Sequence, residues 1–278
     1  MKDLKLNSIG FIGTGNMGSA MIKGIIRSRV AGPESIWIYD QSRSKMEQLN
    51  NELGVLMANS AEEVVHKCSI IVPAVKPAFI GSVMSEIRSA LKSHHIILSI
   101  AAGVTINQLK ELTQNKCYII RTMPNTPALV GEGMTAVCKD PSVPDEYMNA
   151  ACNILKSFGK VEFVTENQIH AATAISGSSP AYAFLFIEAL ADGGVMMGLC
   201  REQSYKMAAQ ALLGSAKMVL ETGKHPGDLK DMVCSPSGTT IEAVASLEND
   251  GFRGAVINAV KVCAQKSIAM GDKNNEKS

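Results

Sequence analysis

Three glycines near the start of the chain constrain its fold more than any other feature. Gly13, Gly15 and Gly18 follow a short β-branched run at 8–12 and open a helical pattern at 17–28. A G-x-G-x-x-G turn between strand and helix permits a tight turn, close approach to a pyrophosphate and close packing of helix on strand. The motif indicates a dinucleotide site only inside a β-α-β unit, because a glycine-rich turn that binds no ligand can have the same sequence pattern.

The first half of the chain supplies that context. Short β-branched runs lie at 8–12, 36–39, 69–72, 96–99, 117–120, 135–138 and 161–164, and helical patterns lie at 17–28, 43–52, 78–91 and 144–158. Strands that alternate with helices of this length predict a mostly parallel, doubly wound sheet that is covered on both faces. We therefore expect an α/β fold with a dinucleotide-binding Rossmann domain over residues 1–166.

The pattern changes after Thr165. Almost all of 167–270 has helical spacing, including a helix over 202–222 that ends at Gly223. Ser179 and Pro180 have the pattern of an N-cap followed by proline at the first helical position. We expect an all-helical second domain over 167–278.

Charge and cysteine usage exclude several classes of function. The chain has 27 Lys and Arg against 26 Asp and Glu, so it lacks the basic excess that nucleic-acid binding requires. Its 7 cysteines lack C-x-x-C pairs and metal-ligand spacing, which indicates reduced thiols in a cytoplasmic protein without a metal site. The uncharged run 171–187 is interrupted by Ser, Gly and Pro, and no signal-peptide pattern precedes the first strand. We therefore expect neither a membrane span nor export.

The end of the second predicted strand bears on the choice of cofactor. Asp40 at this position would bind the adenine-ribose hydroxyls of NAD and repel the 2′-phosphate of NADP. Ser42, Arg43 and Lys45 follow and would suit that phosphate, unless Arg43 and Lys45 lie on a solvated helix face. These residues leave NAD and NADP both open.

Two further strand ends carry candidate ligands, because open α/β sheets bind ligands outside the carboxyl ends of their strands. The segment 72–77 contains Ala74, Lys76 and Pro77, and Lys76 is either a contact to cofactor phosphate or ribose or an ordinary surface lysine. The segment 121–127 holds Asn125 between two prolines. This stiff loop either presents an amide to the nicotinamide or is a rigid connection without a ligand.

The helical half contains two loops rich in small residues, at 174–182 and 229–241. The second predicts a short helix, a Ser/Gly/Thr turn and a new helix that starts near Thr240. Backbone N–H groups and hydroxyls at such a turn can bind a small carboxylate without lysine or arginine. Two capped helices without any ligand have the same local pattern.

Five motifs together resemble the pyrroline-5-carboxylate reductase family. They are GFIGTGNMG at 10–18, VKP at 75–77, MPNTP at 123–127, SGSSPAY at 176–182 and LKDMVCSPSGTT at 229–240. The resemblance extends over nearly the whole chain. It implies reduction of the cyclic imine pyrroline-5-carboxylate to L-proline, the last step of proline biosynthesis, with NADPH or NADH. It also implies a Rossmann domain followed by a helical domain that interlocks two subunits, sometimes in decamers.

The resemblance also implies roles for individual residues. It assigns the substrate carboxylate to Ser235, Thr239 and Thr240, and it places Thr173 and Ser176 near the ring nitrogen. With the candidates above, the residues expected to bind the cofactor are Gly13, Thr14, Gly15, Asn16, Met17, Gly18, Asp40, Arg43, Asn59, Ala74, Lys76, Pro77 and Asn125. Ser179 and Ser237 depart from the family pattern, which commonly has glycine at both positions. Asp40 is also unusual for a member that strictly prefers NADP. We expect NADP, with NAD as the alternative.

A cyclic imine also agrees with the residues that begin the helical half. Residues 166–186 contain no Lys, Asp or Arg, whereas a β-hydroxyacid-type dehydrogenase requires an acid/base there. An imine carbon is already electrophilic and the product nitrogen takes a proton from water, so catalysis would consist mostly of positioning. The alternatives are such a dehydrogenase, disfavoured by the missing lysine, and a non-catalytic NAD(P)-binding sensor, which would not need the 235–240 turn.

The helical half predicts an oligomer. It is apolar and rich in small residues, aromatic residues make up 5% of the chain, and a helical layer of this size buries little by itself. We expect a homo-oligomer with a dimer as its minimal unit, and a small amino-acid-like anion as its substrate.

Overall fold

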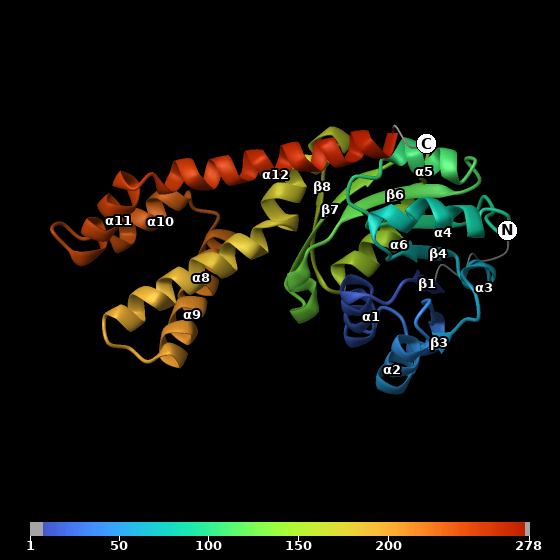
Figure 1. The fold of residues 1–278 in the computed structure, drawn as a ribbon, viewed down its shortest axis with the longest axis horizontal. Coiled ribbons are helices and arrows are strands. Elements are labelled where there is room, and N and C mark those ends of the chain that lie inside the picture. The colour runs from blue at the N-terminus through green and yellow to red at the C-terminus, as the bar shows by residue number, and fades with distance from the viewer. Residues whose placement is uncertain (1–7, 276–278) are drawn as a thin grey trace. The chain divides into compact units, whose positions relative to one another are not determined.

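The computed structural model describes residues 8–275 of the chain, and side chains over 8–271. The expected domains therefore extend at both ends beyond the described residues. The chain divides into two compact units, Met1–Ser178 with Cys263–Ser278, and Ser179–Val262 (Figure 1). The last strand of the described chain ends at Phe163, and everything regular after it is helical. A functional boundary at residue 166 stays a prediction.

The first unit contains one sheet of eight strands in the order β3-β2-β1-β4-β5-β6-β7-β8. The strands are β1 (Ile9–Ile12), β2 (Ile36–Tyr39), β3 (Leu56–Met57), β4 (Ile70–Pro73), β5 (Ile96–Ser99), β6 (Tyr118–Met123), β7 (Gly133–Lys139) and β8 (Gly159–Phe163). Neighbouring strands are parallel except β6 and β7. The strand order reverses between β1 and β4, which is where doubly wound sheets bind ligands. The expected α/β fold is confirmed.

The central strands form where they do because their residues are apolar on both faces. Every residue of β1, β4 and β5 is buried, as is typical of parallel strands that have helices on both sides. Figure 1 shows the helices of this unit around its sheet. They are α1 (Asn16–Arg27), α2 (Arg43–Leu53), α3 (Ala61–Lys67), α4 (Ile80–Ile87), α5 (Ile106–Leu112), α6 (Asp145–Lys156) and α7 (Ile169–Ala172).

Two separate hydrophobic cores hold these layers together. Residues of α1, α2 and α6 pack with one set of strand side chains, including Phe11, Ile38 and Leu98. Residues of α3, α4, α5 and α7 pack with the alternate set, including Ile71 and Ile97. Because successive strand residues point to opposite faces, one run of apolar residues serves both cores.

The second unit is helical. It contains α8 (Ser179–Met196), α9 (Arg201–Thr222), α10 (Pro226–Val233), α11 (Thr239–Asn249) and the first part of α12 (Phe252–Asn275). The expected helix end at Gly223 is confirmed, with a left-handed residue whose N–H donates to the carbonyl of Val219 at 3.1 Å. The expected N-cap at Ser179 is wrong, because Ser179 is already the first residue of α8, and only Ser178 separates it from a π-helical turn, Thr173–Gly177.

Large apolar side chains are exposed throughout the second unit. Met196 and Met197 are each 86% exposed and Leu220 is 79% exposed. Such a surface indicates a face that another protein chain covers.

One helical run of the described chain, Glu166–Met196, is long and apolar enough to cross a membrane by length and composition. It contains the segment 171–187, which we expected to be too polar for this. Only 11% of its most apolar window is buried within the chain. The part of this run in the second unit, α8, belongs to the exposed apolar surface described above.

Candidate active site

The glycine turn after β1 has the geometry that its sequence predicts. Gly13 has a φ of 103°, and a Cβ there would lie 2.5 Å from the carbonyl oxygen of Ala74. A Cβ on Gly18 would lie 2.7 Å from the carbonyl oxygen of Gly13, whereas one on Gly15 would have nothing within 4 Å. The fold therefore requires Gly13 and Gly18, and Gly15 leaves open space that a ligand can approach.

The amino-terminal end of α1 is suited to an anion. Its N-cap, Gly15, has no side chain that accepts from the first N–H groups, and its first turn contains no acidic residue. Beside it lies a cavity of about 330 Å³, which is lined by Thr14, Gly15, Asn16, Ser19, Lys23, Lys45, Gln48, Leu49, Glu52 and Leu129. Lys23 is paired with Glu52 at 2.7 Å, and Lys45 is the second cation of this cavity. Free N–H groups and a nearby cation fit the phosphates of a dinucleotide.

Asp40 points into the glycine turn. Its Oδ2 accepts from the N–H of Thr14 at 2.8 Å and from the Thr14 hydroxyl at 2.9 Å, and its Oδ1 accepts from the N–H of Ser42 at 2.9 Å. Burial raises the pKa of this carboxyl, but these hydrogen bonds and the charge of Lys45 outweigh it, so the pKa lies below its ordinary value. Asp40 is therefore an ionised carboxylate whose hydrogen bonds connect the loops that follow β1 and β2.

The other polar cofactor candidates lie on the surface around this turn. Arg43 is exposed, and its Nε donates to Glu47 at 3.0 Å. Asn59 follows β3, and its amide donates to Glu63 at 3.0 Å. Lys76 is exposed directly after β4, where Pro77 begins a short 3-10 helix. The structure thus groups Gly13–Gly18, Asp40 and Ala74 tightly and leaves Arg43, Asn59 and Lys76 on exposed loops or helix ends.

Asn125 lies in the loop after β6 and is 8% exposed. Its Nδ2 donates to the carbonyl of Ser176 at 2.9 Å, and its Oδ1 accepts from the N–H of Met134 at 2.8 Å. The structure thus brings Asn125 together with Ser176, although these two candidates come from distant motifs.

Thr173 and Ser176 lie on the π-helical turn Thr173–Gly177. The Thr173 hydroxyl donates to the carbonyl of Ile169 at 2.7 Å, and the Ser176 hydroxyl donates to that of Ala172 at 2.9 Å. Each hydroxyl oxygen retains acceptor capacity, and π-helical turns are frequent at functional sites.

The expected carboxylate turn connects α10 and α11 within the second unit. The N–H of Gly238 donates to the carbonyl of Ser235 at 3.0 Å, with Pro236 and Ser237 between them. Ser237 has a φ of 56°, and proline followed by a residue of positive φ is the signature of a type II turn. Glycine is the easiest residue at this position, so the departure from the family pattern at Ser237 adds backbone strain without changing the turn.

This turn leaves the start of α11 open. Gly238 is the N-cap and contributes no side-chain hydrogen bond, while Thr239 and Thr240 are the first two helical residues. Ser235 lies beside them, since a Cβ on Gly238 would come within 2.2 Å of its hydroxyl oxygen. The structure thus brings Ser235, Thr239 and Thr240 together around one set of backbone N–H groups.

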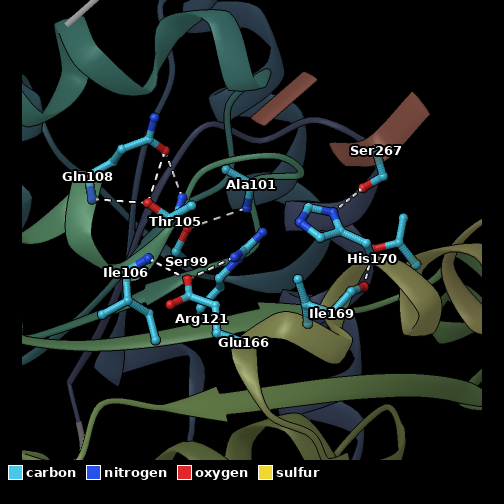
Figure 2. A network of polar contacts seen from close by, with 11 residues as sticks. Ser99, Ala101, Thr105, Ile106, Gln108, Arg121, Glu166, Ile169, His170 and Ser267 are labelled. Atoms are coloured by element: carbon cyan, nitrogen blue, oxygen red, sulfur yellow. Dashed lines mark hydrogen bonds and ion pairs between the residues drawn. The ribbon is translucent and has the colours of Figure 1, made fainter. Parts of the chain in front are cut away.

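A polar network that joins β6 to the short 3-10 helix Glu166–Gln168, before α7, was not predicted from the sequence (Figure 2). Arg121 is 3% exposed, and its Nη1 donates to Glu166 Oε1 at 2.8 Å. The same oxygen accepts from the N–H of Ile106, the first residue of α5, at 2.7 Å. A buried charge inside an otherwise apolar strand requires a partner of opposite charge, and this rule could have predicted the pair from the sequence.

The network borders a second cavity of about 410 Å³, which is lined by Thr105, Asn107, Gln108, Glu111, Arg121, Glu166, Asn167, His170 and Ile268. His170 Nδ1 lies 2.9 Å from the Ser267 hydroxyl on α12. Over the described residues, no group of three or more His, Cys, Asp or Glu side chains is arranged to hold a metal ion.

Both halves of this chain are similar in sequence to known protein families. The model of NADP oxidoreductases, coenzyme F420-dependent, matches residues 8–103, and that of pyrroline-5-carboxylate reductase dimerisation matches residues 166–270. The pyrroline-5-carboxylate reductase of Escherichia coli (strain K12) is 52% identical over 259 residues, which cover 93% of this chain and 96% of the relative. That of Methanosarcina acetivorans is 39% identical over 95% of this chain and 98% of the relative.

Solved structures agree in fold. The Plasmodium falciparum pyrroline carboxylate reductase with NADP bound is 38% identical, with a TM-score of 0.87 over 95% of this chain and 98% of that one. The Coxiella burnetii pyrroline-5-carboxylate reductase is 32% identical, with a TM-score of 0.89 over the same shares.

The doubly wound sheet, the glycine turn and the dimerisation domain define a dinucleotide-dependent oxidoreductase. The degree of identity then narrows this class. The chain belongs to the pyrroline-5-carboxylate reductase family.

Proposed function

We propose that this protein reduces pyrroline-5-carboxylate to L-proline with NADPH, the last step of proline biosynthesis. The observation that carries the proposal is 52% identity to a reductase of that name over 93% of the chain. When bound, NADPH supplies the hydride that the imine carbon takes up, and the ring nitrogen takes a proton from water. The chain's own residues then need only bind and orient the two molecules.

The cofactor is held at the glycine turn. The open start of α1, beside Gly15, would hold its phosphates, and Lys45 is a cation in the lining of that cavity. Asp40 is bonded to Thr14 and Ser42, so its hydrogen-bonding capacity is largely taken up by the protein. This supports NADPH as the main cofactor, while the remaining charge of Asp40 weakens the preference over NADH.

The substrate carboxylate is held at the start of α11, by Ser235, Thr239 and Thr240. The support for this assignment is the open N-terminus of the helix together with the hydroxyls around it. Thr173 and Ser176 orient the imine nitrogen from the π-helical turn.

Replacing Thr240 by alanine tests the carboxylate assignment. We expect KM for pyrroline-5-carboxylate to rise about tenfold or more, because a hydrogen bond to a charged group contributes roughly 1.5–3 kcal/mol. The dissociation constant for NADPH should stay unchanged. Thr222, at the end of α9, supplies a matched control, because its hydroxyl donates to the carbonyl of Met218. An unchanged KM in Thr240→Ala would show that the carboxylate binds elsewhere.

The dimerisation domain makes the protein a homo-oligomer. A dimer is its minimal unit, because the exposed apolar helices of the second unit need a covering chain. Decamers are the further assembly that the family resemblance implies. The same argument assigns the Glu166–Met196 run to a subunit interface and not to a membrane. The formal net charge of +1 supports the absence of nucleic-acid binding. The scattered cysteines support a location in the cytoplasm.

Sedimentation tests this assembly. At micromolar concentration we expect a species of at least twice the mass of one chain, with no fraction at the mass of a single chain. A stable single-chain species without added detergent would contradict the dimer, and recruitment to lipid vesicles would favour a membrane instead.

A further inference from the structure

We infer that Asn125 is a positioning residue of this reaction, which holds the π-helical turn of Ser176 in place and does not bind the cofactor. The inference rests on the proposed function, in which Thr173 and Ser176 orient the imine. It assigns Asn125 a role that differs from the one its loop position suggests.

The carbonyl of Ser176 lacks the partner that an α-helix would give it. In an α-helix a carbonyl accepts from the N–H four residues later, and that residue is Pro180. Proline has no N–H, and its ring crowds the carbonyl four residues before it. The backbone widens at this point, where the N–H of Ser178 donates to the carbonyl of Thr173, five residues back, at 2.8 Å. The sequence thus removes the α-helical donor of a partly buried carbonyl.

The side chain of Asn125 supplies the missing donor. Its Nδ2 lies 2.9 Å from the Ser176 carbonyl oxygen, and its Oδ1 lies 2.8 Å from the nitrogen of Met134. A reversed amide would face a carbonyl with its oxygen and an N–H with its NH₂ group, so both neighbours fix the same orientation. One amide therefore joins the loop after β6, strand β7 and the π-helical turn.

The hydroxyls of the turn do not replace this connection. Thr173 and Ser176 both donate back to carbonyls of the preceding helical turn. The π-helical turn packs closely on the sheet, since a Cβ on Gly177 would lie 3.0 Å from Cε of Met123, at the end of β6. A small shift of the turn would therefore change this contact. Loss of the Asn125 amide would release the Ser176 carbonyl and let the turn shift against the sheet.

Pro180 provides a specific rescue. In Pro180→Ala the helix regains an N–H for the Ser176 carbonyl, so the need for Asn125 falls. We therefore compare Asn125→Ala, Pro180→Ala and the double variant, with Asn149→Ala on the exposed face of α6 as a control for an asparagine change elsewhere in this unit. The readouts are the dissociation constant for NADPH, measured by fluorescence without substrate, and kcat and KM for pyrroline-5-carboxylate.

We expect Asn125→Ala to lower kcat by about tenfold or more, because small misplacements of positioning groups have effects of this size. The dissociation constant for NADPH should stay within roughly twofold, and the double variant should regain at least about threefold in kcat. If Asn125→Ala does not fold, Asn125→Asp keeps the acceptor for Met134, removes the donor and serves in the same comparison.

Three results would overturn the inference. They are an NADPH dissociation constant that rises in parallel with the loss of activity, an unchanged kcat, and a double variant no better than Asn125→Ala. Failure of the proposed function is distinct from these, because the unaltered protein would then not turn over pyrroline-5-carboxylate at all.

Discussion

Gly13→Ala is expected to lower the affinity for NADPH by about 100-fold or more, which corresponds to roughly 2.7 kcal/mol. Gly13 has a φ of 103°, where an L side chain is strained, and its Cβ would lie 2.5 Å from the carbonyl oxygen of Ala74. Because Ala74 follows β4 and its N–H is bonded to Ile12 at 2.8 Å, the backbone there has little room to move. The glycine turn must shift instead, and the start of α1 moves with it. Titration of NADPH fluorescence measures the effect.

Gly15→Ala distinguishes an effect on ligand binding from an effect on folding stability. A Cβ on Gly15 has nothing within 4 Å, so this variant should keep the thermal stability of the unaltered protein while it weakens NADPH binding. Gly13→Ala should lose both stability and binding. Native affinity in Gly13→Ala, or a marked loss of stability in Gly15→Ala, would show that the turn does not have this geometry.

Glu166→Ala is expected to lower the free energy of unfolding by roughly 2–3 kcal/mol, at fixed protein concentration. The change leaves Arg121, which is 3% exposed, without its carboxylate, and it removes the acceptor of the Ile106 N–H. This loss lies below the roughly 3–5 kcal/mol typical of a fully buried pair, because the Glu166 side chain is itself 34% exposed. Urea unfolding of the two proteins at one concentration checks the difference.

Replacing the other member of the pair, Arg121, should lower the free energy of unfolding by less. Arg121→Met removes the buried charge and leaves Glu166, which reaches solvent and still accepts from Ile106. The two variants therefore report on desolvation of the guanidinium and not on the pair's attraction alone. Equal losses, or a larger loss in Arg121→Met, would contradict the account of Arg121 as the buried partner.

Strands whose apolar residues contrast clearly with polar flanking residues were predictable from the sequence. The bounds of β2 and β5 agree with the apolar runs at 36–39 and 96–99. The two-residue strand β3 and the seven-residue helices α3 and α5 were not predicted, because segments this short barely show a period. Their caps were nevertheless readable, since Ser60 and Thr105 each precede Glu or Gln by three residues and accept from that N–H.

The candidate site was predictable where one local motif contains it. The glycine turn and the 235–240 turn are local, and their backbone geometry follows from glycine and proline positions. Contacts between distant segments were not predictable, such as Asp40 with Thr14, Asn125 with Ser176 and Arg121 with Glu166. Such pairs depend on how the strands are ordered in the sheet, which no single motif encodes.

The most direct test of the central claim is the oxidation of NADPH and of NADH by the purified protein with pyrroline-5-carboxylate, with L-proline identified as the product. We predict turnover with both cofactors and a higher kcat/KM with NADPH. A higher kcat/KM with NADH would mean that the charge of Asp40 governs the cofactor choice. Absence of turnover with either cofactor, in a protein that binds NADPH, would contradict the assignment as a reductase of this imine.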